Sequence, residues 1–276
     1  MNQKDIKLIA LDMDGTLLNR ASRLTERTKS TLERAIAKGV HVVIATGRVF
    51  HAFPEDIFKV KGIEYAASSN GARVMRLSDQ ASIYTNLISR EKAEELKPYI
   101  FQDDLFLEIF FDGNVYVEKG CVDRLEQYHL PARYTEYMLR TRTRIEDLKK
   151  AMEDHMDGLE NININFGSPE RKKELGTILY SMEGITATSS FPHNIEIGGA
   201  TTSKADGVAH LCEILKVDPS QVMACGDNFN DVKMFQFAGL SVAVDNAEDD
   251  VKKQVDFVTK SNEEDGVAFA IEKFVL

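Results

Sequence analysis

Residues 6–18 read Ile-Lys-Leu-Ile-Ala-Leu-Asp-Met-Asp-Gly-Thr-Leu-Leu, and the architecture of the chain can be worked out from them. The first six residues form a short, largely apolar run, which is typical of a strand buried on both faces. The run ends in two aspartates, Asp12 and Asp14, and Gly15 and Thr16 then break the strand. Groups at the carboxyl end of a strand in an open α/β sheet face the ligand crevice. The two aspartates are therefore candidate ligand-binding residues.

A pair of carboxylates this close in sequence requires an explanation. Two like charges about 4 Å apart repel by roughly 1 kcal/mol in water and about 4 kcal/mol at an effective dielectric of 20. A protein that holds two carboxylates together usually supplies a cation or keeps one of them protonated. Asp-Gly is also ordinary turn chemistry, so a turn without a ligand remains the alternative for this stretch taken alone.

The composition of the chain excludes several classes of protein. Its 276 residues, 43% of them hydrophobic, suffice for one large domain or two modest ones. The formal net charge of −10 argues against a sequence-independent nucleic-acid binder, which needs a basic surface. No apolar run approaches a membrane span and the N-terminus has no signal-peptide core, so we expect a cytoplasmic protein that meets no membrane. We expect free thiols at the three widely spaced cysteines: Cys121, Cys212 and Cys225.

A strand–helix–strand unit follows the two aspartates. The pattern predicts a helix within residues 25–39 and a second buried strand over residues 40–45, which ends in Thr46-Gly47. Such units join parallel strands through a right-handed crossover, so Thr46 should lie on the same sheet edge as Asp12. A Thr-Gly pair at a strand end can bind an anion through its hydroxyl and backbone N–H groups, or it can be a simple turn.

Residues 84–189 show a different pattern, in which hairpin strands and helices indicate an α+β domain with an antiparallel sheet. One helix is predicted over residues 144–156. Apolar and polar side chains alternate along the strand predicted over residues 159–166. We expect its polar side to be a solvated sheet face: Asn161, Asn163 and Asn165. A nearby run of arginines is also expected at the surface: Arg140, Arg142 and Arg144.

Residues 190–276 return to alternating strands and helices. Ser203 or Thr202 can cap a helix, and Lys204 then lies in its first turn. A lysine beside the positive end of a helix dipole is unfavourable, which indicates that anions hold it there. An ordinary surface lysine is the alternative.

A further buried strand over residues 222–225 ends in Gly226-Asp-Asn-Phe-Asn-Asp231 and brings a second pair of aspartates, Asp227 and Asp231. Two carboxylate pairs at the ends of separate strands of one sheet are typical of an oxygen-rich site for a hard cation such as Mg²⁺. We therefore predict an α/β fold whose parallel-sheet core comprises residues 1–83 and 190–276, with an α+β domain over residues 84–189 inserted in it.

These residues resemble the motifs of the haloacid dehalogenase (HAD) superfamily of phosphotransferases. The four motifs that match, in order along the chain, are Asp12-Met-Asp-Gly-Thr-Leu-Leu, Thr46-Gly-Arg, Lys204 and Gly226-Asp-Asn-Phe-Asn-Asp231. The insertion looks like a type IIB cap, and Asn70-Gly-Ala and Asn246-Ala are similar to the Cof-type sugar-phosphate phosphatases. The resemblance implies a Rossmann-like core. The chain departs from the family pattern at Ala205 and Asp245, where glycine is common, which leaves the local backbone geometry there open.

The resemblance also implies a role for each site residue. Asp12 would be the nucleophile that forms an aspartyl-phosphate, and Asp14 the general acid and base. Crowded among like charges, Asp14 should hold a proton more readily than a free aspartate. The residues implied to hold the phosphoryl oxygens are Thr46, Gly47, Lys204 and Asn230. The implied ligands of Mg²⁺ are Asp12, the backbone carbonyl of Asp14, and Asp227, with Asp231 as a ligand or a neighbour of one.

The function implied is that of a Mg²⁺-dependent phosphatase for small phosphorylated metabolites, with sugar phosphates as the default substrates. The cap would close over the site and select the leaving group. A phosphomutase of the same superfamily is the nearest alternative, and a catalytically weak regulator that binds a phosphorylated metabolite is another. We expect a monomer or a small homo-oligomer with no nucleic-acid partner.

Overall fold

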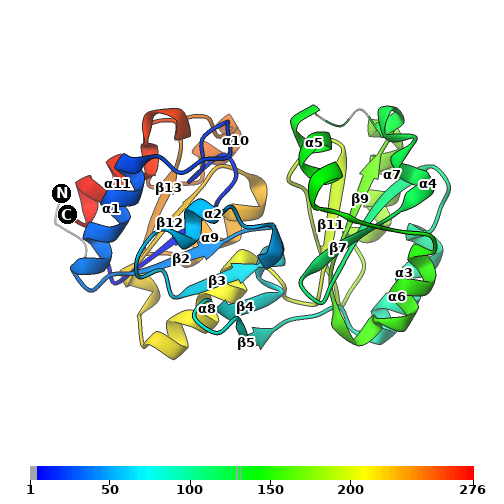
Figure 1. Ribbon diagram of the computed structural model, residues 1–276, viewed down its shortest axis with the longest axis horizontal. Helices are drawn as coiled ribbons and strands as arrows, with labels where there is room; N and C mark the ends of the chain where they lie inside the picture. The colour runs from blue at the N-terminus through cyan, green and yellow to red at the C-terminus, as the bar shows by residue number, and fades with distance from the viewer. Residues whose placement is uncertain (1–4, 129, 131) are drawn as a thin grey trace. The chain divides into compact units, whose positions relative to one another are not determined.

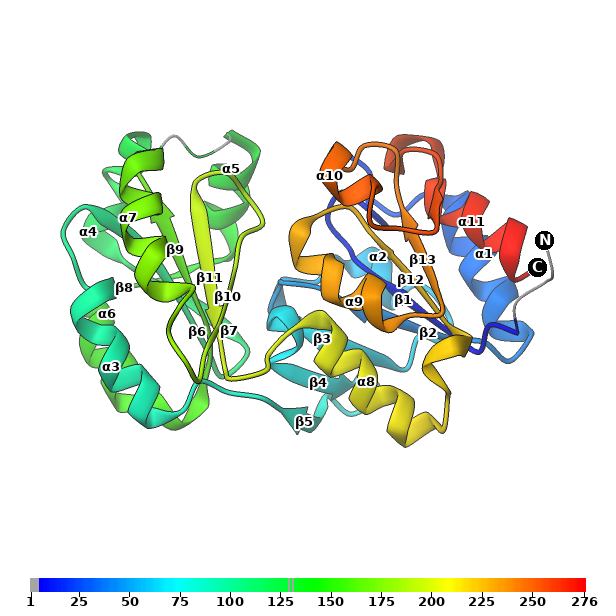
Figure 2. The same ribbon diagram turned by 180° about the vertical axis from the view of Figure 1, so that it is seen from behind.

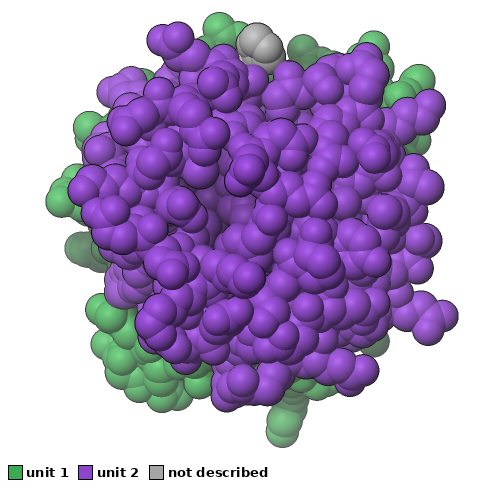
Figure 3. All heavy atoms as spheres, turned by 90° about the vertical axis from the view of Figure 1, so that its right-hand side faces the viewer, with its two compact units in different colours: residues 1–48, 53–85, 203–276 green, residues 49–52, 86–202 purple. Residues whose placement is uncertain are grey.

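The computed structural model describes residues 5–128, 130 and 132–276 of the chain (Figure 1). The chain divides into two compact units, which Figure 3 shows in different colours. Unit 1 comprises the segment that ends at Arg48 together with residues 53–85 and 203–276, and unit 2 comprises residues 49–52 and 86–202. Each unit has its own β-sheet and its own hydrophobic core.

Unit 1 is built on an eight-stranded sheet. Its strands are, in spatial order, β14 (Phe257–Val258), β13 (Leu240–Ala243), β12 (Val222–Gly226), β1 (Leu8–Leu11), β2 (His41–Ala45), β3 (Tyr65–Ser68), β4 (Arg73–Arg76) and β5 (Ala81–Thr85). All neighbours from β14 to β3 pair in parallel, and β4 and β5 add an antiparallel edge. The central strands are apolar because both faces of this sheet are covered, as predicted for a parallel α/β core.

Two helices of unit 1 begin at a capping residue that the sequence signals. The helices of the unit are α1 (Glu26–Ala37), α2 (Glu55–Phe58), α8 (Lys204–Leu215), α9 (Val232–Phe237), α10 (Asp249–Lys252) and α11 (Gly266–Phe274). The hydroxyl of Thr25 caps α1 and that of Ser203 caps α8, each accepting a backbone N–H of the first turn. Figures 1 and 2 both show α1 beside α11, with which it packs.

The connection between β3 and β4 runs past the ends of β2 and α8. It has four residues, because Ser68 pairs with Arg73. Asn70 and Gly71 adopt positive φ angles of 55° and 91°, and the backbone N–H of Asn70 donates to the carbonyl of Thr46 at 2.9 Å. A side chain at Gly71 would overlap the carbonyl of Ser203, so only glycine allows this close approach.

Unit 2 contains a six-stranded sheet in the order β10 (Thr186–Thr188), β11 (Asn194–Gly198), β9 (Leu159–Phe166), β6 (Leu105–Phe111), β7 (Asn114–Glu118) and β8 (Thr143–Ile145). All neighbours are antiparallel except β7 and β8. The helices of the unit are α3 (Arg90–Ile100), α4 (Lys119–Val122), α5 (Ala132–Thr141), α6 (Leu148–Asp154) and α7 (Pro169–Leu179). The helix predicted over residues 144–156 starts only at Leu148, because Thr143–Ile145 pairs with β7 and Asp147 caps the helix.

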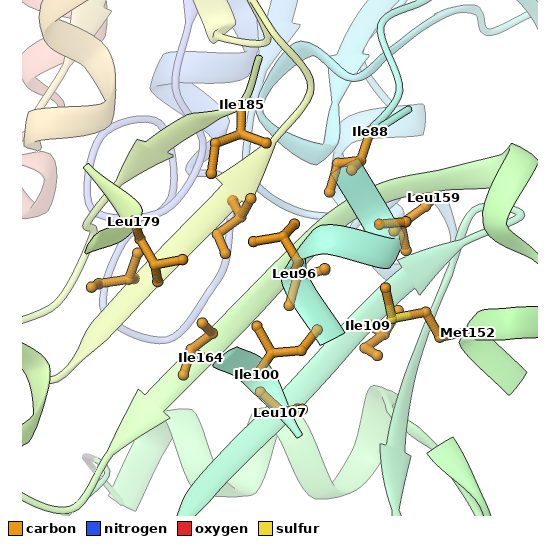
Figure 4. Packing of buried hydrophobic residues seen from close by; sticks show 14 of the residues in the cluster. Ile88, Leu96, Ile100, Leu107, Ile109, Met152, Leu159, Ile164, Leu179 and Ile185 are labelled. Atoms are coloured by element: carbon orange, nitrogen blue, oxygen red, sulfur yellow. The ribbon is translucent and has the colours of Figure 1, made fainter. Parts of the chain in front are cut away.

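One face of the unit-2 sheet is apolar and carries the core of this unit. Figure 4 shows Leu96 and Ile100 from α3 packed over Ile109 of β6 and Ile164 of β9, with Met152 of α6 beside them. Each of these side chains is at least 99% buried. This apolar side of the strand over residues 159–166 is the one its alternating pattern predicts.

The opposite face of the same sheet is polar but buried, contrary to the sequence-based expectation. Asn161, Asn163 and Asn165 are at most 4% exposed. Glu108 on β6 is fully buried and accepts hydrogen bonds from Arg142 Nε at 2.6 Å and from Asn163 Nδ2 at 2.5 Å. The predictions that these asparagines and Arg142 face solvent are therefore wrong, because a buried ion pair with hydrogen-bonded partners forms here instead.

The strands also fix the boundary between the units. β10 and β11 pair with each other, and β11 pairs with β9 along Asn194–Ile197, so residues 190–202 belong to unit 2. The second boundary therefore lies between Thr202 and Ser203 and not at residue 190. Both β11 and the loop that follows it were predicted as parts of the core.

Candidate active site

Two neighbouring parallel strands bring the acidic sequences together. Leu11 of β1 pairs with Cys225 of β12, and the backbone N–H of Asp12 donates to the Cys225 carbonyl at 2.9 Å. Asp12 and Asp227 therefore leave the sheet at the same edge, although 215 positions separate them in the sequence. This is the carboxyl edge at which open α/β sheets bind their ligands.

Lys204 lies between two of these aspartates. Its Nζ is 2.6 Å from Asp12 Oδ1 and 2.6 Å from Asp231 Oδ1, and its side chain is only 1% exposed. Burial lowers the pKa of Lys204, but the two carboxylates outweigh burial and raise the pKa above its ordinary value. The lysine is a fixed positive charge, held by anions in the first turn of α8 as the helix-dipole argument predicts.

Asp231 connects this lysine to the turn that follows β12. Its Oδ2 accepts the backbone N–H groups of Asp227 and Asn228, each at 3.0 Å. A Cβ at Gly226 would lie 2.5 Å from the Asp231 carboxyl carbon, so the absence of a side chain there lets the turn close on this carboxylate. Asp231 therefore orders the loop and also contributes charge to the cluster.

Asp227 completes the carboxylate cluster. Its Oδ1 accepts a hydrogen bond of 2.7 Å from the Thr16 hydroxyl, and Gly15, at φ +80°, approaches so closely that a Cβ would lie 2.5 Å from Asp227 Oδ2. Burial, with the charge of Asp231, raises the pKa of Asp227 to about 6. Burial also raises the pKa of Asp12 well above its usual value, although Lys204 opposes the rise.

The chemistry of this cluster suits a divalent cation. One carboxylate oxygen from each of Asp12, Asp227 and Asp231 lies within 4.8 Å of the others. Three carboxylates against one ammonium leave an excess of negative charge in a buried place, which a hard cation with oxygen ligands would neutralise. Asp12 Oδ1 is taken by Lys204 and Asp227 Oδ1 by Thr16, so Asp12 and Asp227 each keep a second oxygen for a ligand, whereas both oxygens of Asp231 already accept hydrogen bonds.

The carboxylate of Asp14 is not part of this cluster. Its side chain is 48% exposed, and its two oxygens accept hydrogen bonds from Arg48, at 2.7 Å from Nε and 2.6 Å from Nη2. The expectation that like charges surround Asp14 is therefore wrong. The strand ends at Leu11, so the two-residue alternation that would turn Asp12 and Asp14 to one side does not continue. The crowding falls instead on Asp12 and Asp227.

The remaining predicted site residues are Thr46, Gly47 and Asn230, and each of them lies against Asn70. Thr46 is buried at the end of β2 and accepts the N–H of Arg48 at 3.2 Å. Asn230 Nδ2 donates to Asn70 Oδ1 at 3.2 Å, and a Cβ at Gly47 would lie 3.2 Å from that same oxygen. Within the described part of the chain, the buried Oδ1 of Asn230 accepts no hydrogen bond, so it can accept one from a ligand.

Sequence reasoning assigned no role to Arg48 or Asn70, although both belong to motifs that it quoted. The signal that was available is their position, within three residues of the ends of β2 and β3 at the carboxyl edge of the sheet.

The described residues also include no helix of the length and apolarity that a membrane crossing requires.

The fold and these motifs define the class of protein. The chain matches the haloacid dehalogenase-like hydrolase family over residues 9–271 and belongs to that family. It is 30% identical over 276 residues to the 5-amino-6-(5-phospho-D-ribitylamino)uracil phosphatase YcsE of Bacillus subtilis (strain 168), with 99% of this chain and 97% of the relative covered.

Solved structures show the same fold. A haloacid dehalogenase-like hydrolase from B. subtilis matches with a TM-score of 0.85 and 26% identity over 98% of this chain and 100% of that chain. The HAD subclass IIB sugar phosphatase BT4131 matches with a TM-score of 0.79 and 22% identity over 97% of this chain and 98% of that chain. The predictions of the superfamily, the α/β fold and a phosphatase of this class are confirmed.

Proposed function

We propose that the chain is a Mg²⁺-dependent phosphatase that hydrolyses small phosphorylated metabolites through an aspartyl-phosphate on Asp12. The observation that carries this proposal is the buried cluster in which Lys204 touches both Asp12 and Asp231, with Asp227 beside them. A merely structural ion pair needs one carboxylate for one lysine, whereas this cluster keeps carboxylate oxygens in excess. Such an excess at the carboxyl edge of a parallel sheet is suited to phosphoryl transfer.

In the first step, an oxygen of Asp12 attacks phosphorus while the bond from phosphorus to the alcohol oxygen breaks. The departing oxygen takes the proton of the Asp14 carboxyl group, so a neutral alcohol leaves. In the second step, water attacks the phosphorus of the aspartyl-phosphate and gives its proton to Asp14. The bond between phosphorus and Asp12 breaks, and inorganic phosphate and both original side chains are regenerated.

The other site residues would stabilise the charges of the Asp12 carboxylate and of the phosphoryl oxygens during these steps. Lys204 fixes the Asp12 carboxylate through the contact at 2.6 Å and supplies a positive charge beside the transferred group. Thr46, Gly47 and Asn230 would donate hydrogen bonds to the phosphoryl oxygens. Mg²⁺, held by Asp12, Asp227, the carbonyl of Asp14 and Asp231, would neutralise charge that develops on the phosphoryl oxygens.

The substrate class is proposed from the named relatives. The leaving alcohol of any alkyl phosphate needs a proton, so the reaction alone does not select among them, but the relative YcsE is named for a phosphorylated ribityl compound. We propose sugar phosphates and related polyol phosphates as substrates, with unit 2 in the role of the cap that selects among them.

The test is phosphate release from a panel of phosphorylated metabolites, including the compound for which YcsE is named, with Mg²⁺ or with EDTA. We expect activity with Mg²⁺, none in EDTA, and none for Asp12→Asn with Mg²⁺. Asp79→Asn is the matched control, because Asp79 is an exposed carboxylate paired with Arg76. Full activity of Asp12→Asn would refute the nucleophile, and an isomerised sugar phosphate without free phosphate would indicate a phosphomutase.

A further inference from the structure

The contact between Arg48 and Asp14 has a two-point geometry, which three other arginine–aspartate pairs of the described residues share: Arg23 with Asp56, Arg76 with Asp79 and Arg90 with Asp157. The guanidinium meets the carboxylate at two points, Nε with Oδ2 at 2.7 Å and Nη2 with Oδ1 at 2.6 Å. A two-point contact of planar groups fixes the orientation of the carboxylate as well as its position. A lysine in the same place would fix the position alone.

Arg48 is the anchored member of the pair. Its side chain is 10% exposed, whereas that of Asp14 is 48% exposed. The backbone of Arg48 is held on both sides, since its N–H donates to Thr46 Oγ1 at 3.2 Å and its carbonyl accepts the N–H of Ser69 at 2.9 Å. The arginine therefore extends from the fixed end of β2, and the carboxylate that it holds stands on the loop after β1.

Asp14 depends on this arginine for its orientation. Within the described part of the chain, Arg48 is the sole hydrogen-bond or ion-pair partner of the Asp14 carboxylate. A half-exposed aspartate without a partner samples several staggered rotamers. A group that transfers a proton must stay within hydrogen-bond reach of the reacting oxygen, so loss of orientation lowers the rate of that transfer.

A second pair of the same type in unit 1 shows what an ordinary surface contact looks like. Arg76 also meets Asp79 at two points, at 3.0 and 2.7 Å, but both side chains are about half exposed, at 47% and 50%. These residues are three positions apart on one strand end and turn, while Arg48 and Asp14 are 34 positions apart. The difference is that the Arg48 side chain is only 10% exposed and its backbone is anchored at the sheet edge.

We propose that Arg48 is a positioning residue, which orients Asp14 for proton transfer to the leaving alcohol and from the attacking water. The proposal rests on the proposed phosphatase function. It assigns to Arg48 no contact with the reacting atoms, and it predicts an effect that depends on how much the leaving group needs a proton.

The first test compares two substrates that differ in that need. An alkyl phosphate expels a poor leaving group that requires protonation, whereas p-nitrophenyl phosphate expels a stable phenolate. We expect Arg48→Ala to lower kcat/KM for an alkyl phosphate about 10–100-fold, a fraction of the roughly 10²–10⁴-fold that general acid catalysis supplies. The loss for p-nitrophenyl phosphate should be at least fivefold smaller. Arg76→Ala is the matched control and should change both values less than twofold.

A double-mutant cycle tests whether Arg48 acts through Asp14. In the Asp14→Asn background, Arg48→Ala should cost less than threefold, because the group that it orients is already absent. Arg48→Lys should recover only part of the loss, and added guanidinium should raise the activity of Arg48→Ala but not that of Arg76→Ala. An equal loss with both substrates, or a full additional loss in the Asp14→Asn background, would overturn the proposal.

A measurement without turnover separates this proposal from the proposed function. The Nε–H resonance of Arg48, observed with ¹⁵N-labelled arginine in the full chain, should shift in Asp14→Asn and not in Asp79→Asn. An unchanged resonance would show that the contact does not form in solution and would overturn the positioning role. If the wild-type chain releases no phosphate from any substrate, the phosphatase proposal fails, whatever the resonance shows.

Discussion

Replacing Lys204 by methionine tests the charge balance of the carboxylate cluster. Methionine keeps an unbranched chain of similar length but removes the ammonium, so Asp12 and Asp231 each lose a contact of 2.6 Å. Both carboxylates are at least 93% buried, so solvent can do little to replace that contact. Removing one partner of a buried ion pair typically costs about 3–5 kcal/mol. Since 1 kcal/mol shifts the midpoint of a chain of this size by about 2–4 °C, we expect a decrease of roughly 6–20 °C.

The assay is thermal unfolding by calorimetry at pH 7.5, first in EDTA and then with Mg²⁺. The exposed pair of Lys119 with Glu146 provides the control, since Lys119→Met should change the midpoint by no more than about 2 °C. Mg²⁺ should raise the midpoint of Lys204→Met more than that of the wild type, because the bound cation compensates a larger negative charge. The double variant Lys204→Met with Asp12→Asn should be less destabilised than Lys204→Met alone.

A particular result would refute this reasoning. If Lys204→Met unfolded in EDTA within about 2 °C of the Lys119→Met control, the carboxylates around it would not be buried charges that need a counter-ion. The cluster would then be a hydrated surface feature, and the argument for a cation between Asp12, Asp227 and Asp231 would lose its physical basis.

Three further predictions concern other parts of the chain. Gly226→Ala places a Cβ 2.5 Å from the carboxyl carbon of the fully buried Asp231, so it should lower phosphatase kcat at least tenfold and also lower the unfolding midpoint, as measured by phosphate release and calorimetry. Arg142→Met leaves the fully buried Glu108 without its cation and should destabilise the chain by about 3–5 kcal/mol in urea unfolding, whereas Arg142→Met combined with Glu108→Gln should recover most of the loss. Burial raises the pKa of Asp56, but its two basic neighbours outweigh burial and the pKa is lowered. Its contribution to stability is therefore present above about pH 4 and is lost as pH falls through the folded value, so Asp56→Asn should be less stable than wild type at pH 7, with a difference that shrinks below pH 4 in urea unfolding.

The sequence was sufficient to predict the features that depend on local backbone preferences. The run before Asp12, the cap at Ser203 and the position of Lys204 in the first turn of a helix follow from periodicity, capping and the dipole. Because the carboxyl ends of parallel strands lie at one edge of a sheet, the sequence alone also predicts that Asp12 and Asp227 lie near each other.

The sequence was insufficient to predict the ion-pair partners of side chains that pair with a residue distant in the sequence. Asp14 was expected beside like charges, but its partner Arg48 lies 34 positions away. No local pattern reveals such a pair, because the loop after β1 decides the direction of Asp14. Arg142 and Glu108 are a second example, since a charged residue in a polar run normally indicates solvent and only the tertiary structure reveals its buried counter-ion.

The order of the segments in unit 1 has a consequence for how the protein is made. β1 needs β12 as its neighbour, and Asp12 needs Lys204, which the ribosome adds 192 residues later. At about 5–20 residues per second, the nascent chain waits roughly 10–40 s for this partner. Residues 86–202 of unit 2 are all synthesised within that interval. The apolar strand β1 thus emerges long before its neighbour β12. This N-terminal part of the polypeptide is therefore the part that a chaperone would have to shield from aggregation for longest.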